Sequence, residues 1–240
     1  DVSEESVYVK AEILDNRFGS KTYLLAWTTT PWTLPGNVAM AVGSDIDYVV
    51  VKPSQADISS GIEDALYILA KAKVEVLFSN PEIKKELKGS DLVDMHYKQL
   101  FDVPVLQSEK SFKVYIADFV TTEDGTGIVH TAVMYGEEDY ELGLKVGLPA
   151  VQLFNAQGVF NEQATEFLRG KFYKDTEPEI ISALEQNKTL FKKEVYTHSV
   201  PFCWRCGTRL YYSALPSWFI NIQKIKPRLL ELNEDINWFP

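Results

Sequence analysis

Hydrophobic and polar positions alternate through much of the first half of the chain, which predicts a β-rich fold. Residues 6–14, SVYVKAEIL, have the period of two that is typical of a half-buried strand. Residues 22–28, TYLLAWT, are continuously apolar and rich in β-prone side chains, which also favours a strand. Further strands are predicted at 38–42, 48–51, 113–119, 128–133, 151–154 and 210–215.

A smaller number of segments have the spacing of helices. Apolar residues at intervals of three and four predict a helix over 61–74. Residues 137–146 begin with three acids and end before Gly147, which is typical of a helix. Strands with inserted helices indicate an α+β fold, and we expect its core to be a closed or nearly closed β-barrel. The remaining helices are predicted at 81–88, 178–187 and from 227 to at least 232.

Composition narrows the class of protein. With 45% hydrophobic and 12% aromatic residues, the 240-residue chain can bury a sizeable core, which excludes a disordered chain. Its net charge of −10 repels phosphate at long range, so an extended basic nucleic-acid groove is not expected, although a local docking site stays open. No apolar run approaches the roughly 18–20 residues of a membrane span. Without an initiator methionine, a signal peptide or a disulfide framework, the chain is expected to be part of a longer cytoplasmic protein.

Three consecutive threonines, Thr28, Thr29 and Thr30, end a predicted strand and precede the segment Pro-Trp-Thr-Leu-Pro-Gly. The two prolines interrupt regular structure, so an ordered loop is expected. Hydroxyl and free backbone N–H groups can bind an ester or a ribose hydroxyl, and Trp32 could form the wall of a small apolar pocket. A Thr-rich strand end with a stiff turn is the commoner explanation of such a pattern.

A second candidate cluster begins with the predicted turn at 123–127. It puts His130 on a strand just after a Gly-x-Gly pair, which lets the backbone approach a ligand. A single histidine on a strand is more often structural than catalytic. Glu137, Glu138 and Asp139 suit the start of a helix as capping or solvated residues, whereas an inward-facing Asp139 would bind an ammonium group. Spacing alone does not decide between these roles.

Cys203 and Cys206 form one Cys-x-x-Cys unit, which is half of a four-ligand zinc site. The chain has no other cysteine, and His198 is the one histidine nearby in sequence. A redox dithiol usually lies between a strand and a helix, which Pro201 and the β-prone residues around it do not favour. We expect half of a zinc knuckle or a vestigial one. Phosphate-binding loops, nucleophile elbows and H-E-x-x-H helices are absent.

Four motifs occur in one order: TTTPWTLPGN at 28–37, EDGTGIVH at 123–130, GEEDY at 136–140 and PFCWRCGTRLYYSALPSWFI at 201–220. Together they resemble the editing domain, or connective peptide 1, inserted in isoleucyl-tRNA synthetases. The resemblance runs from about residue 6 to the end. It implies an editing domain at 1–200 and, at 201–240, a segment that returns to the synthetase catalytic domain. The family's His-Ile-Gly-His and Lys-Met-Ser-Lys-Ser signatures are absent, so this chain is not expected to perform ATP-dependent aminoacylation.

Differences from the sister families point to the isoleucyl member. Valyl and leucyl domains usually have Thr-Thr-Arg-Pro-Glu-Thr where this chain has Thr-Thr-Thr-Pro-Trp-Thr, and valyl domains tend to have Lys in place of His130. One departure from the isoleucyl pattern follows Ala132, where Val133-Met134-Tyr135 replaces a common Ala-Pro and could reshape the pocket wall.

The resemblance implies proofreading, that is, hydrolysis of the ester of valyl-tRNA(Ile), with valyl-adenylate as a second candidate substrate. A synthetic site rejects valine poorly because one missing methylene changes binding little, and the editing site excludes isoleucine by size. In the family, the residue at Asp139 binds the substrate ammonium, and the residue at His130 shapes the side-chain sieve and orients the ester or water. The implied catalytic residues are Asp139, His130 and Thr30, and the implied substrate-binding residues are Thr28, Thr29, Trp32 and Asn37.

The resemblance also implies the partners and cofactors. A positioned water attacks the ester without a covalent intermediate and without a cofactor. Zinc on Cys203 and Cys206 is expected only in a longer parent enzyme that supplies the other ligand pair. The expected partners are the acceptor end of tRNA(Ile), the valine it carries and the rest of the synthetase, with no membrane. Alternatives are an acceptor-end binding module with weak or lost hydrolysis and a free-standing editing protein, the latter disfavoured by the returning motif at 217–220.

Overall fold

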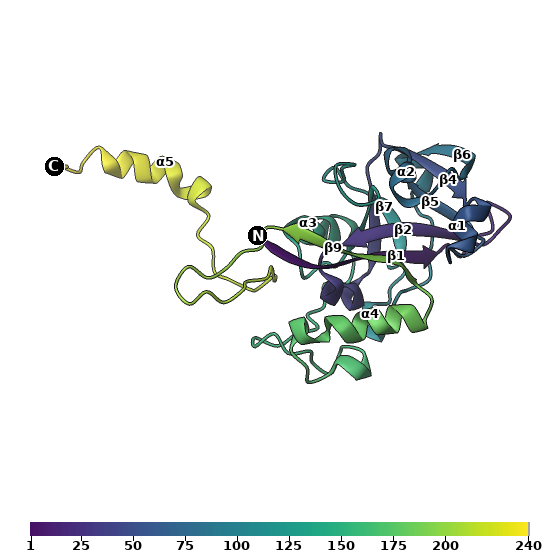
Figure 1. Cartoon of the computed structure of the whole chain (residues 1–240). Helices are drawn as coiled ribbons and strands as arrows, with labels where there is room; N and C mark the ends of the chain where they lie inside the picture. The colour runs from purple at the N-terminus through teal and green to yellow at the C-terminus, as the bar shows by residue number, and fades with distance from the viewer. Residues whose placement is uncertain (240) are drawn as a thin grey trace.

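The computed structural model describes residues 1–239, whose strands form a six-stranded and a three-stranded sheet (Figure 1). Across the larger sheet lie β6 (Glu82–Lys88), β4 (Asp47–Lys52), β5 (Leu66–Ala70), β2 (Thr22–Thr28), β1 (Val2–Glu12) and β9 (Leu190–His198). Across the smaller sheet lie β7 (Lys113–Ile116), β3 (Ala39–Val42) and β8 (Ile128–Thr131). Two pairs, β2 with β5 and β3 with β7, are parallel, and the other neighbours are antiparallel.

Helices are short and lie around the sheets (Figure 1). The α-helices are α1 (Gln55–Ser59), α2 (Val74–Leu77), α3 (Glu137–Val146), α4 (Glu177–Gln186) and α5 (Ile222–Asn233). The 3-10 helices are η1 (Pro31–Gly36), η2 (Lys71–Lys73), η3 (Gly89–Leu92), η4 (Pro104–Leu106), η5 (Glu166–Leu168) and η6 (Tyr173–Thr176). Among the described residues, no helix combines the length and the apolar character needed to cross a membrane.

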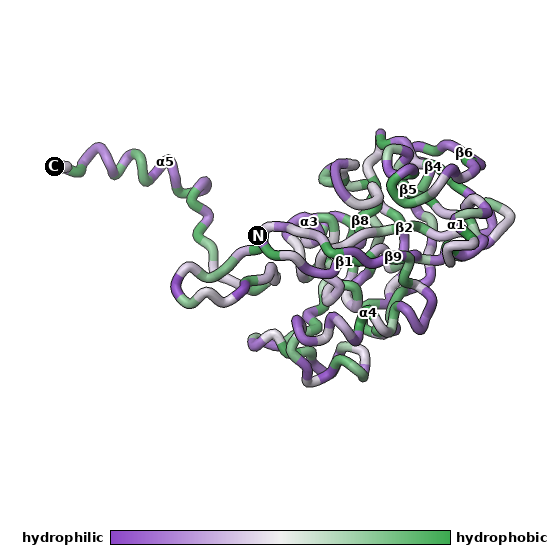
Figure 2. Tube along the Cα trace, viewed as in Figure 1, coloured by the Kyte–Doolittle hydropathy of each residue, from purple (hydrophilic) through white to green (hydrophobic). Residues whose placement is uncertain are grey.

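The larger sheet is buried on both faces at its centre. In β2, Leu24 belongs to one hydrophobic cluster and Leu25 to another, and neither side chain is exposed. This explains why β2 is continuously apolar instead of alternating. The hydrophobic residues accordingly concentrate in the central strands (Figure 2).

The β-rich α+β class is confirmed, but the closed barrel is not. Within residues 1–239 each sheet remains open, with β6 and β9 at the edges of the larger one and β7 and β8 at the edges of the smaller one. The sequence pattern revealed strands but not how their outer edges pair, because closure depends on contacts between distant segments.

Two predicted helices are wrong. Residues 66–70 of the segment 61–74 form the buried strand β5, and only the short η2 and α2 follow it. A strand covered on both faces has no alternation, so its apolar residues also match a helical spacing. Residues 82–88 of the segment 81–88 form β6, because pairing with β4 outweighs the helix preference of its lysines and glutamates.

The other predicted elements are mostly confirmed. The predicted strands near β1, β2, β3, β4, β7 and β8 and the predicted helices at α3, α4 and α5 are present, whereas β9 was missed. The predicted strands at 151–154 and 210–215 are wrong, since Phe154 makes only an isolated bridge to Phe160 and 210–215 has no strand. The loop after Thr30 contains the regular turns of η1, which two prolines at compatible positions allow.

The hydroxyl group of Tyr48 joins the two sheets. Tyr48 lies on β4 and is not exposed. Its hydroxyl oxygen accepts a hydrogen bond from the N–H of Gly43 (3.1 Å), just after β3, and it donates to the carbonyl oxygen of Gly127 (2.5 Å), just before β8. Both backbone groups lie at the same end of the smaller sheet, where β3 ends and β8 begins. One buried side chain therefore satisfies both groups and sets the distance between the two sheets.

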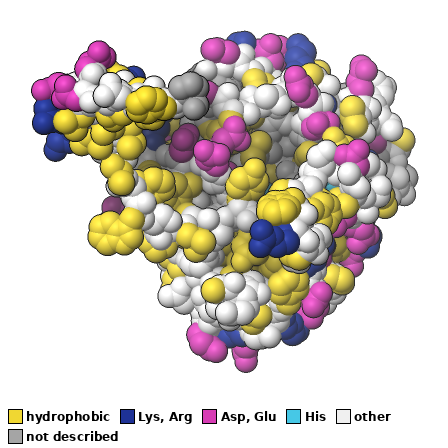
Figure 3. All heavy atoms as spheres, turned by 90° about the vertical axis from the view of Figure 1, so that its left-hand side faces the viewer, with side chains coloured by type: hydrophobic (Ala, Val, Ile, Leu, Met, Phe, Trp, Pro, Cys, Tyr) yellow, Lys and Arg dark blue, Asp and Glu magenta, His cyan; other side chains and the backbone are white. Residues whose placement is uncertain are grey.

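The chain beyond β9 contacts the body on the side of the N-terminus and then extends away from it to α5 (Figure 1). Arg209 forms an ion pair with Glu4 of β1, and Glu4 also pairs with Lys174 (3.0 Å). The Ala214 N–H donates to the Met134 carbonyl (3.2 Å). Past this point α5 projects away, with hydrophobic side chains gathered along one side and charged ones on the other (Figure 3).

Replacing Tyr48 by Phe is expected to lower the free energy of unfolding by about 1–3 kcal/mol, because it leaves two buried backbone groups without partners. Denaturant unfolding monitored by tryptophan fluorescence measures the change. Tyr212→Phe, at a side chain that is 64% exposed, is the matched control and should change stability little. Equal stability of the two variants would contradict the structural role of the Tyr48 hydroxyl.

Candidate active site

The threonine loop is held by its own hydroxyl groups. Thr28 ends β2, and its Oγ1 accepts a hydrogen bond from the backbone N–H of Thr30 (3.1 Å). Thr33, on η1, donates its hydroxyl hydrogen to the carbonyl oxygen of Thr30 (2.8 Å). Pro31 begins η1, where its fixed φ suits the first position of a helix. Thr29, between Thr28 and Thr30, is half-buried. The loop is therefore preorganised.

His130 connects this loop to the smaller sheet. It lies on β8, buried, with its Nε2 3.0 Å from the Thr33 Oγ1. The shorter contact of the Thr33 hydroxyl, to the Thr30 carbonyl, favours donation there, and in the matching tautomer Nε2 carries the proton and donates to Thr33. Burial lowers the pKa of His130 to about 4, so the ring is neutral at pH 7. Its Nδ1 is then a buried acceptor with no hydrogen-bond partner among residues 1–239.

Asp139 is the third residue of α3, and its side chain turns back toward the end of β8. Its Oδ2 accepts a hydrogen bond from the Ala132 N–H (3.1 Å). Burial raises the pKa of Asp139 to about 6, against the lowering effect of that hydrogen bond, and the nearby Glu138 carboxylate adds to the rise. The inward-facing position is thus the one that Asp139 adopts, and Glu137 and Glu138 remain exposed.

A cavity of about 490 Å³ lies beside the Asp139 carboxylate. Phe119, Val129, Gly136 and Tyr212 contribute to its lining. A Cβ atom at Gly136 would lie 3.0 Å from Asp139 Oδ2, so the glycine leaves this oxygen accessible. The alternation of β8 turns Val129 toward this cavity and His130 toward the threonines. Thr131 and Ala132 follow His130 in the chain, and the Ala132 N–H contacts Asp139.

The structure thus brings together Thr28, Thr30 and His130, with Asp139 adjacent, but it uses two other predicted residues differently. Trp32 is buried in an aromatic cluster, with its ring centroid 4.6 Å from that of Tyr173. The Asn37 amide donates to the Ala39 carbonyl (2.9 Å) and accepts from the Tyr97 hydroxyl (2.7 Å). Both side chains stabilise the scaffold here, and their contact with a substrate stays a prediction.

Sequence reasoning missed Thr33 and Gly136. The sequence signal for Thr33 is its place three residues after Thr30. Residues at this spacing lie on the same side of a 3-10 helix, so Thr33 adds a fourth hydroxyl to the three of Thr28, Thr29 and Thr30. Gly136 was visible as the residue before the acidic run, but the need for space beside Asp139 follows only from the fold.

The Gly-x-Gly pair serves the turn before β8 and contacts no site residue. Gly125 and Gly127 have φ of +65° and +74°, and a Cβ at Gly127 would lie 2.5 Å from the Ala70 side chain. Glycine is therefore required here for backbone conformation and close packing.

Cys203 and Cys206 lie in a small hairpin on the far part of the chain. The Cys203 N–H donates to the Thr208 carbonyl (2.8 Å), and the Gly207 N–H donates to the Cys203 carbonyl (2.8 Å). Hydrogen bonds from Thr208 and Cys203 lower the pKa of Cys206 to about 7. Residues 1–239 contain no group of three or more His, Cys, Asp or Glu placed to hold a metal ion, so these two thiols supply only half of a zinc site.

Curated relatives match this chain along its whole length. The isoleucine–tRNA ligase of Clostridium acetobutylicum is 42% identical over 240 residues, and that of Picrophilus torridus is 42% identical over 241 residues; each alignment covers 100% of this chain and 22% of the relative. The chain belongs to the isoleucine–tRNA ligase family. This member spans 22% of the length of the curated ligases that it matches. No family model matches the chain.

The fold of this chain matches that of solved synthetase editing domains. The cytosolic leucyl-tRNA synthetase editing domain of P. falciparum matches with a TM-score of 0.62 at 10% identity, covering 81% of this chain and 100% of that one. The corresponding domain of P. knowlesi matches with a TM-score of 0.60 at 13% identity, covering 81% and 97%. The chain therefore has the fold of these editing domains, and this likeness does not depend on its sequence motifs.

Replacing Asp139 by Asn is expected to raise the free energy of unfolding at pH 7 by about 1–3 kcal/mol. The rise of the Asp139 pKa from 3.8 to about 6 means that the fold disfavours the charged carboxylate, and the difference corresponds to at most about 3 kcal/mol. Wild-type stability is therefore lost as pH rises from about 4 to 6, and the advantage of the variant should vanish below pH 4.

Denaturant unfolding at pH 4, 5, 6 and 7 measures this difference. Glu141→Gln, at another exposed acid of α3, is the matched control and should show no such pH-dependent gain. A constant difference between Asp139→Asn and wild type across this range would show that burial does not disfavour the charge.

Proposed function

We propose that this domain hydrolyses the ester of mischarged valyl-tRNA(Ile), and by the same chemistry valyl-adenylate, while sparing isoleucine. The observation that carries the proposal is the half-buried Asp139 carboxylate, which lies beside a cavity of about 490 Å³ and is hydrogen-bonded to Ala132, two residues after His130 in the chain. Membership of the isoleucine–tRNA ligase family and the editing-domain fold support an editing role.

Asp139 would bind the α-ammonium group of the aminoacyl ester. Its carboxylate has one oxygen hydrogen-bonded to Ala132 and lies where Gly136 leaves space for a donor. A cation that enters this partly desolvated place forms a charge-assisted hydrogen bond and offsets the cost of burying the charge. The exposed Glu137 and Glu138 at the cavity favour the approach of a cationic group over that of an anionic one.

The threonine hydroxyls and His130 would hold the ester and the attacking water. A neutral imidazole has one ring nitrogen that accepts a hydrogen bond, and a water or a ribose hydroxyl could donate it. Water adds to the ester carbonyl carbon, the bond to the ribose oxygen breaks, and that oxygen leaves with a proton as the terminal hydroxyl. Thr30 and Thr28 would contact the aminoacyl group and ribose through hydroxyls already oriented by the loop.

To exclude isoleucine by size, the side-chain pocket must have a rigid wall. His130 is buried and linked by Thr33 to the loop, so moving it would break the network. A packed wall of this kind rejects one additional methylene more sharply than a flexible one.

The departure at Val133–Tyr135 does not weaken this proposal. Val133 is buried against Gly143 of α3, where an added Cβ would lie 2.6 Å from it. The hydroxyl of Tyr135 accepts a hydrogen bond from the Leu153 N–H (2.9 Å) inside the aromatic cluster. Both residues thus pack in the core and leave the His130 network unaltered. The alternative is an acceptor-end binding module without hydrolysis, and deacylation of valyl-tRNA(Ile) distinguishes the two.

The chain beyond residue 200 would connect this domain to the rest of a ligase. The exposed apolar side of α5 would be covered there, as would Trp218 and Phe219, which are almost fully exposed. Zinc would bind Cys203 and Cys206 if such a ligase supplied the second ligand pair.

Replacing Asp139 by Asn is expected to reduce kcat/KM for valyl-tRNA(Ile) deacylation about 100-fold, because the neutral amide cannot pair with the ammonium. Release of labelled valine measures the rate, and isoleucyl-tRNA(Ile) should be spared by the wild type. Glu141→Gln, an exposed acid of α3 outside this cavity, is the matched control and should stay within about twofold. An unaffected rate in Asp139→Asn would remove Asp139 from the site, and wild-type protein that binds valyl-tRNA(Ile) without releasing valine would establish the binding-module alternative.

A second prediction concerns pH. Because Asp139 must be ionised to bind the ammonium and its pKa is about 6, kcat/KM should fall about tenfold per pH unit below pH 6. His130, with a pKa of about 4, adds a further loss only near pH 4. The profile is measured with valyl-tRNA(Ile) between pH 4.5 and 7.5. A flat profile in this range would contradict the role of an ionised Asp139.

A further inference from the structure

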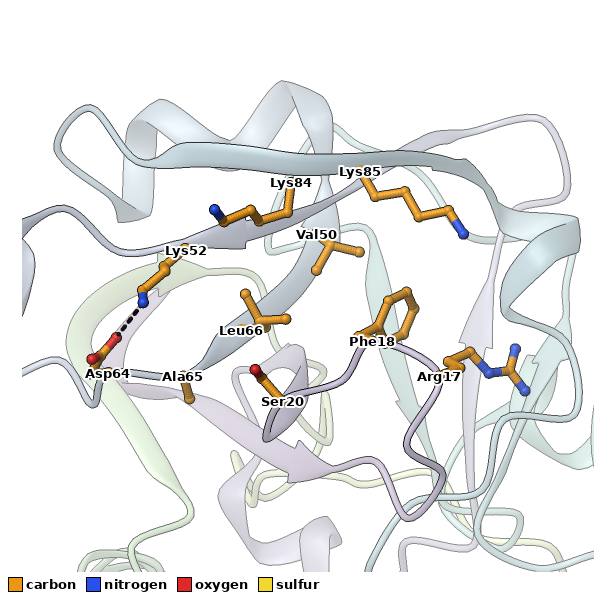
Figure 4. A pocket seen from close by; sticks show the side chains of 10 residues that line it. All are labelled: Arg17, Phe18, Ser20, Val50, Lys52, Asp64, Ala65, Leu66, Lys84 and Lys85. Atoms are coloured by element: carbon orange, nitrogen blue, oxygen red, sulfur yellow. Dashed lines mark ion pairs between the residues drawn. The ribbon is translucent and has the colours of Figure 1, made fainter.

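A second cavity lies at the other end of β2 from the threonine loop. It has a volume of about 620 Å³ and is formed where the turn between β1 and β2 meets β4, β5 and β6 (Figure 4). The six residue steps from Thr22 to Thr28 separate it from the threonine loop by about 20 Å along the strand. The candidate active site uses no residue of this cavity, which we call the β6 groove.

Cations outnumber acids in the β6 groove, although the chain as a whole carries −10. Arg17, Lys52, Lys84 and Lys85 contribute to its lining, against the single acid Asp64. Figure 4 shows Lys85 and Arg17 on the side of the Phe18 ring and Lys52 and Lys84 on the opposite side, with apolar residues between them. An acidic protein that contacts a polyanion must do so at a local concentration of positive charge such as this one.

Lys85 is the cation most available to a ligand. It forms no ion pair among residues 1–239, and its Nζ lies 5.9 Å from the centroid of the Phe18 ring, which holds the ammonium at the rim. Lys84 pairs with Glu82 (2.6 Å), whose side chain is 64% exposed. Exposed pairs of this kind are weak, so a phosphate can displace the carboxylate.

We propose that the β6 groove binds backbone phosphates of the tRNA whose aminoacylated end lies at the threonine loop. This inference rests on the proposed editing function and adds a contact with the tRNA acceptor arm outside the site. With a strand rise of about 3.4 Å per nucleotide, about 20 Å corresponds to roughly six nucleotides from the terminal one. Lys84, Lys85 and Arg17 would contact the phosphates, and no base identity would be read.

The test is the double variant Lys84→Gln/Lys85→Gln. Its matched control is Lys192→Gln/Lys193→Gln, a second pair of adjacent lysines on an exposed strand, whose members pair with Glu194 and Glu185. With valyl-tRNA(Ile), the groove variant should raise KM about tenfold and leave kcat unchanged, and the slope of log KM against log salt should fall by about 1.4 for two lost phosphate contacts. The control should match the wild type.

A valyl ester of adenosine, which is too short to reach the β6 groove, separates this proposal from the proposed function. Wild type and groove variant should hydrolyse it equally. An equal loss with both substrates would show that the lysines only support the fold, and an unchanged KM for valyl-tRNA(Ile) would overturn the groove. If the wild type hydrolyses neither substrate, the editing proposal fails. The groove proposal is then tested by the salt-dependent affinity of the groove and control variants for uncharged tRNA(Ile). Equal affinities of groove and control variants would then refute it.

Discussion

The two sheets can form one site only if their mutual position is fixed, and the buried hydroxyl of Tyr48 provides that constraint. It satisfies a donor after β3 and an acceptor before β8 at once, so neither strand can shift along β4 without leaving a buried polar group unpaired. The placement of β8 then determines the rest: His130 meets Thr33, and the Ala132 N–H meets Asp139. A polar contact remote from the cavity therefore sets the geometry of the site.

Burial acts in opposite directions on the two titratable groups of the candidate site. It raises the pKa of Asp139 and lowers that of His130, so each group is shifted toward its neutral form. The folded protein thus disfavours the ionised form of Asp139, and a bound cationic ligand would stabilise that form. His130 remains a neutral hydrogen-bonding group across the physiological pH range. Groups perturbed in this way, adjacent to a cavity, are characteristic of functional sites.

Local patterns predicted those parts of the fold that depend on local sequence. Strand β2 and helices α3 and α4 were predicted because their hydrophobicity, prolines and caps are encoded within the elements themselves. Strands β5 and β6 were mistaken for helices because their state is decided by pairing with β4. The contact between Thr33 and His130 joins residues 97 positions apart, and no spacing rule reveals it. The four motifs predicted the family and the editing-domain fold, whereas the basic β6 groove has no sequence motif because its residues come from separate strands.

The pairing of β1 with β9 has a consequence for how such a unit can be built into a longer polypeptide. Val2 and His198 are direct neighbours across the two antiparallel strands, so the start of β1 and the end of β9 lie about 5 Å apart. Any host loop joined to these two positions would need to open by no more than the spacing between adjacent strands. The unit can therefore be grafted into, or removed from, a surface turn of another domain without stretching that domain's backbone.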